Sequence, residues 1–411
     1  MAVRERHIAL LVALVLAIFI GFNTIGRERP PATAGSPAPS PVASAAPTAT
    51  ASPAQSPVAP GDVSVQVTKT AVPTEFRYLV LGGGNDFRVV LLDLGAGKAS
   101  EVAVVRLARP ASAPALTYAL LSSSADGRAV LLLVVVPEAT SSVFLVRPET
   151  GDARALARGA VARAEISPDG ARFAAGRNDP DRALAGLWVG TVADGGARRL
   201  VADDPQFAGS PPVPFAFSPD AGLLVFGLGL GETGYRAILV PVSSAEARVD
   251  RSSGEARLEG GGATALGPGT GAQFLSAQEI FVWSSRSLFG GESVAYSYDV
   301  GTKRATELQR PSADTLLGPA AFRPGGAQFF TVERPICCGV GLGTVWLRGR
   351  DGSARKLGEW TFLGEVWWSR DGSRLFATMG GDDATGEVTD LLTGRSVMRF
   401  CRRGAITGAC V

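Results

Sequence analysis

Histidine is almost absent from this chain of 411 residues, and the single copy is His7, close to the N-terminus. The rest of the sequence therefore has no imidazole to act as the base of a Ser-His-Asp or Cys-His catalytic group. It also offers no imidazole ligand for zinc or copper. These absences argue against the common hydrolase mechanisms and against a His-ligated metalloenzyme, and we expect no metal and no cofactor.

An excess of charge of either sign is missing as well. The 40 basic and 38 acidic residues give a formal charge of +2, and they are scattered along the chain. No basic stripe or acidic tail is visible, so we expect no nucleic-acid partner. Beyond Gly61, no segment keeps apolar residues at helical spacing for a dozen residues, which argues against a helical fold.

One long apolar run is present near the N-terminus. Residues 8–26, IALLVALVLAIFIGFNTIG, carry no charge and are long enough to cross a hydrocarbon core of about 30 Å as a helix. Arg4 and Arg6 before the run favour a cytoplasmic N-terminus. We predict an uncleaved single-pass anchor in the cell membrane, with residues 1–7 as a cytoplasmic stub and the remainder extracytoplasmic.

A cleavable signal peptide is the alternative, with Ala32-Thr33-Ala34 as the small-residue site, and it would give a secreted protein. In either case residues 27–60 are dominated by Pro, Ala, Ser and Thr. Such a composition cannot bury a core, so it predicts a disordered, semi-rigid spacer. The spacer leads to one domain over residues 61–411.

Short polar turns recur through this domain, each between two apolar runs. Proline presets the first central backbone angle, aspartate bonds its own backbone and glycine accepts the left-handed conformation, so each motif predicts a tight turn joining two strands. A third and a fourth apolar run follow, which gives four strands per unit. The turns are Ser124-Ala125-Asp126-Gly127, Ser167-Pro168-Asp169-Gly170, Ser218-Pro219-Asp220, Arg323-Pro324-Gly325-Gly326 and Ser369-Arg370-Asp371-Gly372.

The repeat predicts an all-β fold, a β-propeller of seven four-stranded blades. A spacing of roughly 40 to 55 residues with four strands per unit is typical of propeller blades. A β-sandwich is the alternative, although sandwiches lack turns repeated in the same order. The predicted units cover residues 75–106, 116–158, 161–202, 213–262, 272–310, 318–359 and 364–401.

At these turns the chain resembles the propeller family of the translocation protein TolB and its WD-like relatives, whose blades carry a Ser-Pro-Asp-Gly turn between the first two strands. The resemblance covers about residues 61–411 and implies the propeller fold. It implies little about activity, because the motif is a structural turn and the family includes both periplasmic protein-binding scaffolds and propeller caps of serine peptidases.

The long loops of the repeat are the predicted binding face. In a four-stranded blade the loops between the second and third strands lie on the face opposite the tight turns, and function tends to reside in such loops. The contact candidates in and beside them are Arg177, Asp179, Asp181, Tyr235, Arg286, Phe289, Arg334 and Asp382.

Acidic loop residues leave an enzymatic alternative open. A carboxylate-dependent enzyme acting on envelope carbohydrates needs two acids about 5–9.5 Å apart across a cleft. Asn178-Asp179-Pro180-Asp181 and Asp382-Asp383 supply acids, but neither stretch has the spacing of a calcium loop, so we interpret both as solvated loop. The sequence thus favours a membrane-tethered, extracytoplasmic propeller that binds a protein or an envelope polymer without catalysis.

The cysteines lie in the last two predicted units and the tail: Cys337, Cys338, Cys401 and Cys410. An even number in an exported domain suggests disulfides, and we expect bridges that tie the tail to the loop of the sixth unit. A simple Cys401–Cys410 bridge and four reduced thiols are the alternatives. The ring is expected to close at this edge, with the tail or with VSVQVT at Val63 completing a blade.

Removal of residues 1–60 is predicted to leave a soluble, folded, all-β domain, because the spacer contributes nothing to a core. Far-ultraviolet circular dichroism of the 61–411 fragment measures this. An aggregated fragment without a β-type spectrum would contradict the domain boundary.

Overall fold

The computed structural model describes residues 63–83, 86–108, 118–135, 141–203, 211–230, 234–251, 256–285, 291–336, 342–361, 363–380 and 385–401. The chain divides into two compact units, Met1–Ser56 and Pro57–Val411, and every described residue belongs to the second. The predicted stub, anchor and spacer lie outside the described residues. Within the described ranges, no helix has the length and apolar character needed to span a membrane.

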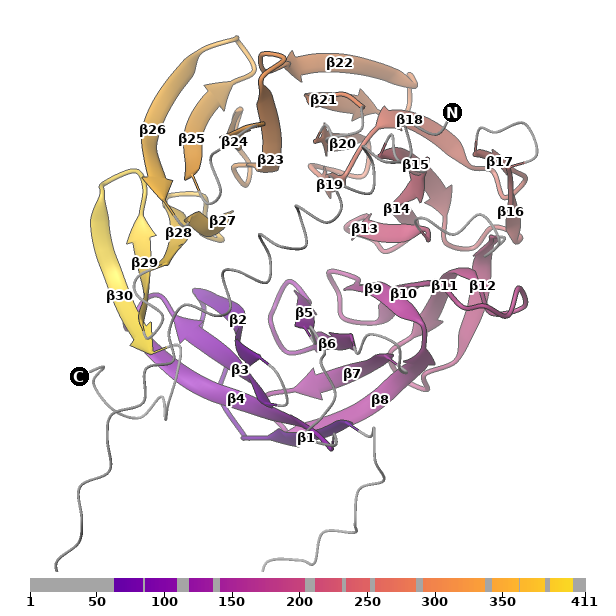
Figure 1. Ribbon diagram of the computed structural model, residues 1–411, viewed down its shortest axis with the longest axis horizontal. Helices are drawn as coiled ribbons and strands as arrows, with labels where there is room; N and C mark the ends of the chain where they lie inside the picture. The colour runs from indigo at the N-terminus through magenta and orange to yellow at the C-terminus, as the bar shows by residue number, and fades with distance from the viewer. Residues whose placement is uncertain are drawn as a thin grey trace, which may run out of the picture. The chain divides into compact units, whose positions relative to one another are not determined.

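The described chain forms seven β-sheets arranged as blades of a propeller (Figure 1). Listed from the centre outwards, blade 1 contains β2 (Phe76–Gly83), β3 (Asp86–Asp93), β4 (Lys98–Leu107) and β1 (Val63–Val67). Blade 2 contains β5 (Tyr118–Ser123), β6 (Val130–Val135), β7 (Ser141–Arg147) and β8 (Asp152–Gly159). Blade 3 contains β9 (Val161–Ile166), β10 (Arg172–Arg177), β11 (Gly186–Thr191) and β12 (Ala197–Ala202).

The remaining blades repeat the same order. Blade 4 contains β13 (Val213–Phe217), β14 (Leu223–Gly229), β15 (Tyr235–Pro241) and β18 (Thr264–Pro268), and blade 5 contains β19 (Gly271–Phe274), β20 (Glu279–Ser284), β21 (Val294–Asp299) and β22 (Arg304–Gln309). Blade 6 contains β23 (Thr315–Phe322), β24 (Gln328–Pro335), β25 (Leu342–Gly349) and β26 (Ala354–Thr361). Blade 7 contains β27 (Leu363–Trp368), β28 (Leu375–Gly380), β29 (Thr385–Asp390) and β30 (Arg395–Cys401). The prediction of a seven-bladed, all-β propeller is confirmed, although only six of the seven sheets have four strands, and the β-sandwich alternative is wrong.

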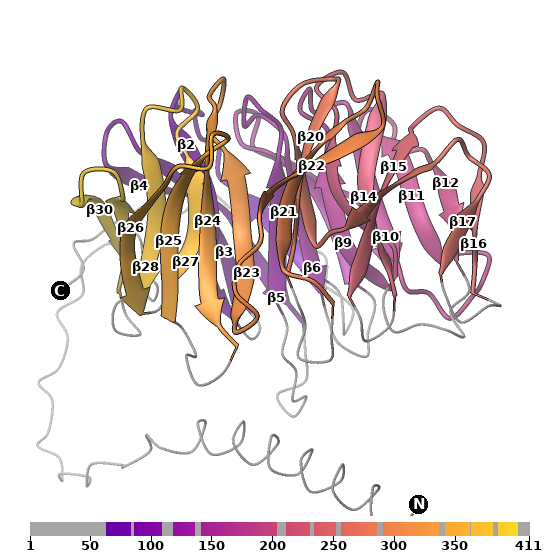
Figure 2. The same cartoon turned by 90° about the horizontal axis from the view of Figure 1, so that it is seen from above.

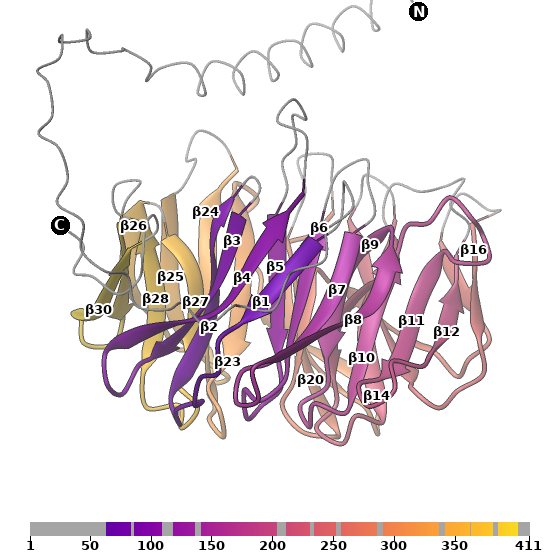
Figure 3. The same ribbon diagram turned by 90° about the horizontal axis from the view of Figure 1, so that it is seen from below.

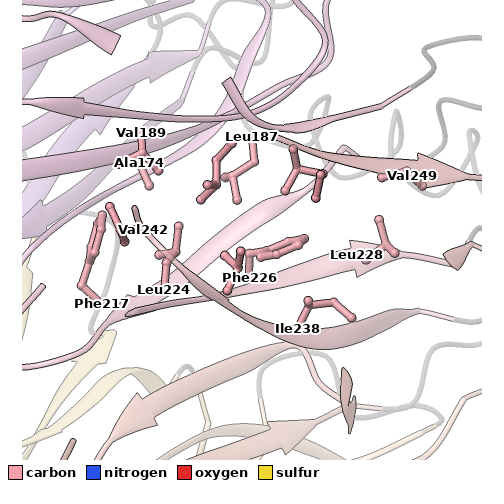
Figure 4. Packing of buried hydrophobic residues seen from close by; sticks show 14 of the residues in the cluster. Ala174, Leu187, Val189, Phe217, Leu224, Phe226, Leu228, Ile238, Val242 and Val249 are labelled. Atoms are coloured by element: carbon pink, nitrogen blue, oxygen red, sulfur yellow. The ribbon is translucent and has the colours of Figure 1, made fainter. Parts of the chain in front are cut away.

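Apolar packing between neighbouring blades forms the core. In the described residues, seven clusters of buried apolar side chains occupy the seven seams of the ring. Figure 4 shows the seam between blades 3 and 4, where Leu187 and Val189 of β11 face Leu224 and Phe226 of β14. Since both faces of each blade are covered in this way, the strands alternate between side chains that point to one neighbour and side chains that point to the other.

Four of the five predicted polar turns, those that begin with serine, share one hydrogen-bonding pattern. In the turn after β9, Ser167 Oγ donates to Asp169 Oδ1 (2.5 Å), and the same carboxylate oxygen accepts the Ala171 amide (3.0 Å). Ser167 is fully buried, and its hydroxyl also accepts the Arg172 amide (2.8 Å). The turns after β5, β13 and β27 repeat these three bonds.

These hydrogen bonds also lower the pKa of the aspartate carboxyl groups. The Ser373 amide and the Ser369 hydroxyl lower the pKa of Asp371 to about 2, because both donate to its ionised form. The aspartate is therefore ionised at neutral pH. Each such turn is an ordered polar cap on the apolar hairpin that it closes.

Blade 1 runs in the opposite direction to its neighbours. Inner strands β5 and β27 end at their Ser-Asp turns, yet it is the beginning of β2 that meets those turns. Tyr78 Oη donates to Gly127 O (2.8 Å), and the Arg370 amide donates to Glu75 Oε1 (2.9 Å). The hairpin of β2 and β3 consequently reverses between Gly83 and Asp86 on the other face of the ring, which is why the first unit has no Ser-Asp turn.

Two faces of the propeller can now be defined, and Figures 2 and 3 show the strands running between them. We call the face that carries the Ser-Asp turns the turn face. The opposite face, to which the second strand of blades 2 to 7 leads, is the loop face. The predicted separation of tight turns from long loops holds for these blades, while blade 1 is reversed.

The ring closes without a strand shared between its first and last blades. Strand β1 pairs with β4 in an antiparallel register that places Val63 opposite Leu107, so VSVQV completes blade 1 itself. Blade 7 is built from one continuous segment. The seam between them is held by side chains, with Leu92 and Phe376 both inaccessible to solvent in its cluster.

The predicted boundary of the fourth unit is wrong, because the chain leaves blade 4 before its last strand. After β15 it forms a hairpin of β16 (Ala247–Asp250) and β17 (Arg257–Glu259), which extends blade 3 to six strands. The alternating pattern of β16 buries Ala247 and Val249 in the seam between blades 3 and 4. A nearly buried ion pair, Arg251 Nη2 to Asp203 Oδ2 (3.0 Å), fixes the hairpin to the end of blade 3.

Replacement of Gly127 by alanine is expected to be more destabilising than replacement of Gly394. Both glycines have left-handed backbone angles (φ 73° and 70°), so each alanine costs about 1 kcal/mol of strain. A Cβ at Gly127 would lie 2.4 Å from Phe76 Cζ, whereas no atom lies within 4 Å of one at Gly394. We expect Gly127→Ala to cost about 1–3 kcal/mol more, measured as the free energy of unfolding in urea. Equal losses would show that the turn of blade 2 does not brace blade 1.

Candidate functional site

A channel opens at the centre of the ring, with a cavity volume of about 750 Å³. Its walls come from the inner strands β2, β5, β9 and β27, together with Phe215 of β13. The inner strands present an unpaired edge to this space, since each is bonded to its own blade on one side only. Four charged side chains stand among the lining residues: Arg77, Arg163, Glu165 and Glu365.

Glu165 is held at the boundary of blades 2 and 3. Ser122 Oγ donates to Glu165 Oε1 (2.7 Å), and the same hydroxyl accepts the Ile166 amide (3.1 Å). Burial between the blades raises the pKa of Glu165 to about 7, while the charge of Arg163 and the hydrogen bond from Ser122 oppose the shift. This carboxyl group therefore gains and loses its proton near neutral pH.

The other two charged side chains of the channel neutralise each other. Arg77 Nη2 lies 2.6 Å from Glu365 Oε2, and its Nε donates to the same oxygen (3.1 Å). The guanidinium also stacks on Trp367, with Cζ 5.2 Å from the ring centroid. Because Arg77 belongs to blade 1 and Glu365 to blade 7, this pair crosses the closing seam.

Apolar side chains are exposed beside these charges. Tyr118 and Leu120 of β5 are 46% and 39% exposed, and they are the exposed large hydrophobic residues among those that the structure describes. Leu120 lines the channel. Strand β5 begins at the loop face, so Tyr118 lies toward the mouth of the channel on that side.

Arg177 and Asp179, two of the predicted contact residues, are paired with each other. Arg177 Nη2 lies 3.0 Å from Asp179 Oδ2, and the two side chains are only 15% and 13% exposed. The guanidinium also lies over Trp188, 5.6 Å from the ring centroid. Both side chains therefore stabilise the loop that follows β10.

The other described candidates are dispersed over the loop face. Asp181 is exposed and caps a turn by accepting the Ala183 amide (2.9 Å). Tyr235 is half-buried at the start of β15, and Arg334 is half-buried near the end of β24, with Nη2 3.5 Å from Leu363 O. Among the described candidates, only Arg177 and Asp179 contact each other. Arg286, Phe289 and Asp382 lie outside the described residues.

The cysteine prediction also falls largely outside the described chain. Cys337, Cys338 and Cys410 are beyond the described ranges, and Cys401 is described only as the last backbone position of β30. The disulfide pairing stays a prediction. In the described part of the chain, no group of three or more His, Cys, Asp and Glu side chains is placed to hold a metal ion.

Sequence reasoning missed the residues that line the channel. A signal was present, because ARAEI at residues 162–166 places two charged residues at alternate positions of a strand that otherwise packs in a seam. FRYLV and LGEVWW contain Arg77 and Glu365 in the same kind of strand. Charged residues inside the innermost strand of a propeller indicate its channel, whereas the predicted contact residues all lie in or beside the long loops.

No family model matches the chain, and no curated protein matches it either. Several solved structures match the chain at low sequence identity. A structure assigned as TolB from Agrobacterium tumefaciens is 14% identical, with a TM-score of 0.43, and the match covers 68% of this chain and 91% of that one. An oligogalacturonate lyase from Vibrio parahaemolyticus is 12% identical over 82% of this chain and 85% of that one, with a TM-score of 0.49.

A further match is a structure from Bacteroides uniformis assigned as a 6-phosphogluconolactonase, 15% identical over 79% of this chain and 94% of that one, with a TM-score of 0.47. The resemblance to TolB-like propellers is thus present at the level of the fold. The fold assignment rests on the seven blades themselves, and a propeller fold does not define a reaction.

Glu165→Gln is expected to remove a pH dependence of stability. When the pKa of a carboxyl group is raised in the folded state, here from 4.5 to about 7, the folded protein loses stability as the pH rises through that interval. Glutamine does not titrate, so the free energy of unfolding of the wild type should fall by on the order of 2 kcal/mol relative to that of the variant over the same interval. Urea unfolding across this pH range measures the difference, and parallel curves would contradict the buried environment of Glu165.

Proposed function

We propose that the protein is a binding module, in which the propeller receives a segment of a protein partner through the loop-face mouth of its channel, without catalysis. Tyr118 and Leu120 carry the proposal. Large apolar side chains exposed beside a concave, partly charged space are characteristic of surfaces that another molecule covers. In this proposal residues 8–26 anchor the module in the cell membrane and the partner is extracytoplasmic.

The position of the first strand is compatible with such a tether. Val63 lies at the loop-face end of β1, because it is paired with Leu107, the last residue of β4. Residues 27–62 join the propeller there. A Pro-rich extended spacer of this length reaches about 100 Å, so an anchored propeller has room for a partner at the loop face.

The charged groups of the channel favour binding over hydrolysis. Glu165 and Glu365 come from different blades, as the carboxylate-dependent alternative requires, and Glu165 with a pKa of about 7 suits a general acid. Glu365, however, is held by two hydrogen bonds from Arg77, so its charge is already engaged.

Leu120→Arg is expected to abolish capture of the partner by the full-length protein. The added cation would fill the channel mouth and remove the apolar contact, while an exposed site tolerates the change without unfolding. Photo-crosslinking in membranes, followed by mass spectrometry, compares wild type with this variant. Arg304→Gln on the outer strand β22 is the control and should crosslink as wild type does.

An identical set of crosslinked proteins from wild type and Leu120→Arg would overturn the channel-mouth assignment. Capture of a polysaccharide in place of a protein would replace the proposed partner class with an envelope polymer. Thermal unfolding of each variant separates loss of binding from loss of the fold.

A further inference from the structure

Arg163 and Glu165 form a small polar group with Ser122 on the wall of the channel. Residues two apart in a strand share a face, and both side chains line the same cavity. Ser122 approaches from β5 of the neighbouring blade and fixes one oxygen of the Glu165 carboxyl group. The three side chains therefore line the same cavity, and two of them are joined by a hydrogen bond.

Arg163 makes no ion pair with another described residue, although its charge acts on Glu165. Arg77 and Glu365 are paired with each other, and among the described residues Arg163 has no ion-pair partner within 4 Å. Its side chain is exposed to the channel. When Glu165 carries a proton, the group has a net positive charge and two kinds of donor, a guanidinium and a carboxylic acid.

We infer that Arg163, Glu165 and Ser122 form a subsite for a carboxylate group of the partner, and that this group is the C-terminus of a peptide chain with apolar last residues. A guanidinium presents two parallel N–H donors that match the two oxygens of a carboxylate. Leu120, which is exposed in the same cavity, supplies an apolar contact for the side chains that precede the terminus, and Leu121 and Phe215 also line the cavity. The inference rests on the proposed function and deepens it.

The subsite is linked to pH because ionised Glu165 would repel the incoming carboxylate, whereas protonated Glu165 can donate a hydrogen bond to it. Neighbouring inner strands β5 and β13 carry no Asp, Glu, Lys or Arg. In β10, Arg172 donates to Ala221 O (3.4 Å) and Arg177 is paired with Asp179. Among the described residues, the remaining charged side chains that line the cavity are Arg163 on the same strand and the Arg77–Glu365 pair, so Glu165 is the group whose charge is expected to change with pH.

The test uses the full-length protein and three synthetic probes. The first is acetyl-Leu-Ala-Phe with a free C-terminal carboxylate, the second is its C-terminal amide, and the third is an amidated peptide whose last residue is glutamate. Calorimetric titration at about pH 5.5 and about pH 8.5 brackets the titration of Glu165. We expect the free carboxylate to bind about tenfold more tightly than the amide, and more tightly at the lower pH.

Variants assign the effect to the three side chains. Arg163→Gln should weaken binding of the free carboxylate about tenfold, and Arg163→Lys should retain part of it, because the charge remains and the paired donors are lost. Glu165→Gln should make the affinity independent of pH, since glutamine keeps a donor that does not titrate. Arg304→Gln is again the matched control and should bind as wild type does.

Equal binding of the acid and the amide, no binding of either, or unchanged affinity in Arg163→Gln would each overturn the subsite. Binding of the glutamate peptide as tight as that of the free terminus would support the carboxylate subsite and overturn its assignment to a chain end. These peptide-binding outcomes do not change the result of the crosslinking experiment that tests the proposed function. Failure of wild type to crosslink a protein, with carboxylate binding intact, would overturn the proposed partner and leave the subsite standing.

Discussion

Each blade of this propeller is apolar on both faces, and it can bury them only between two neighbouring blades. The seven seam clusters are the result, and they include fully inaccessible residues such as Val89, Phe281 and Phe329. Burial of that kind contributes about 25 cal/mol per Å² of apolar surface, and no single four-stranded blade obtains it alone. A closed ring satisfies this constraint for every blade at once, so the ring is the smallest unit that can be stable.

The same constraint explains why blade 1 can be reversed. Seam packing requires apolar side chains on both faces of a strand, and it does not depend on strand direction. Tyr78 and Leu79 of β2 still point into opposite seams, as residues of the other inner strands do. The reversal instead changes which groups meet at the turn face, where the side chains of Glu75 and Tyr78 bond the backbone of the turns of blades 7 and 2.

The number of blades could be predicted from the sequence because each Ser-Asp turn is a local structure that depends on a few adjacent residues. The direction of blade 1 and the β16–β17 hairpin could not, since both depend on contacts between distant segments, such as Arg251 with Asp203. The candidate site divides in the same way. The long loops could be recognised from their composition. The placement of Arg163 and Glu165 beside Ser122 on the channel wall depends on the packing of β9 against β5, which the sequence alone does not give.

Closure by side chains alone has a consequence for how the chain folds. Leu79 and Leu92 in the first blade form their seam with Phe376 and Met398, which lie about 300 residues further along the chain, so this seam cannot form before the last blade is present. Contacts this distant in sequence slow folding, because loop-closure entropy must be overcome before they form. During synthesis the first blade would expose an apolar flank until the last blade emerges, which gives the nascent chain an aggregation-prone surface for that interval.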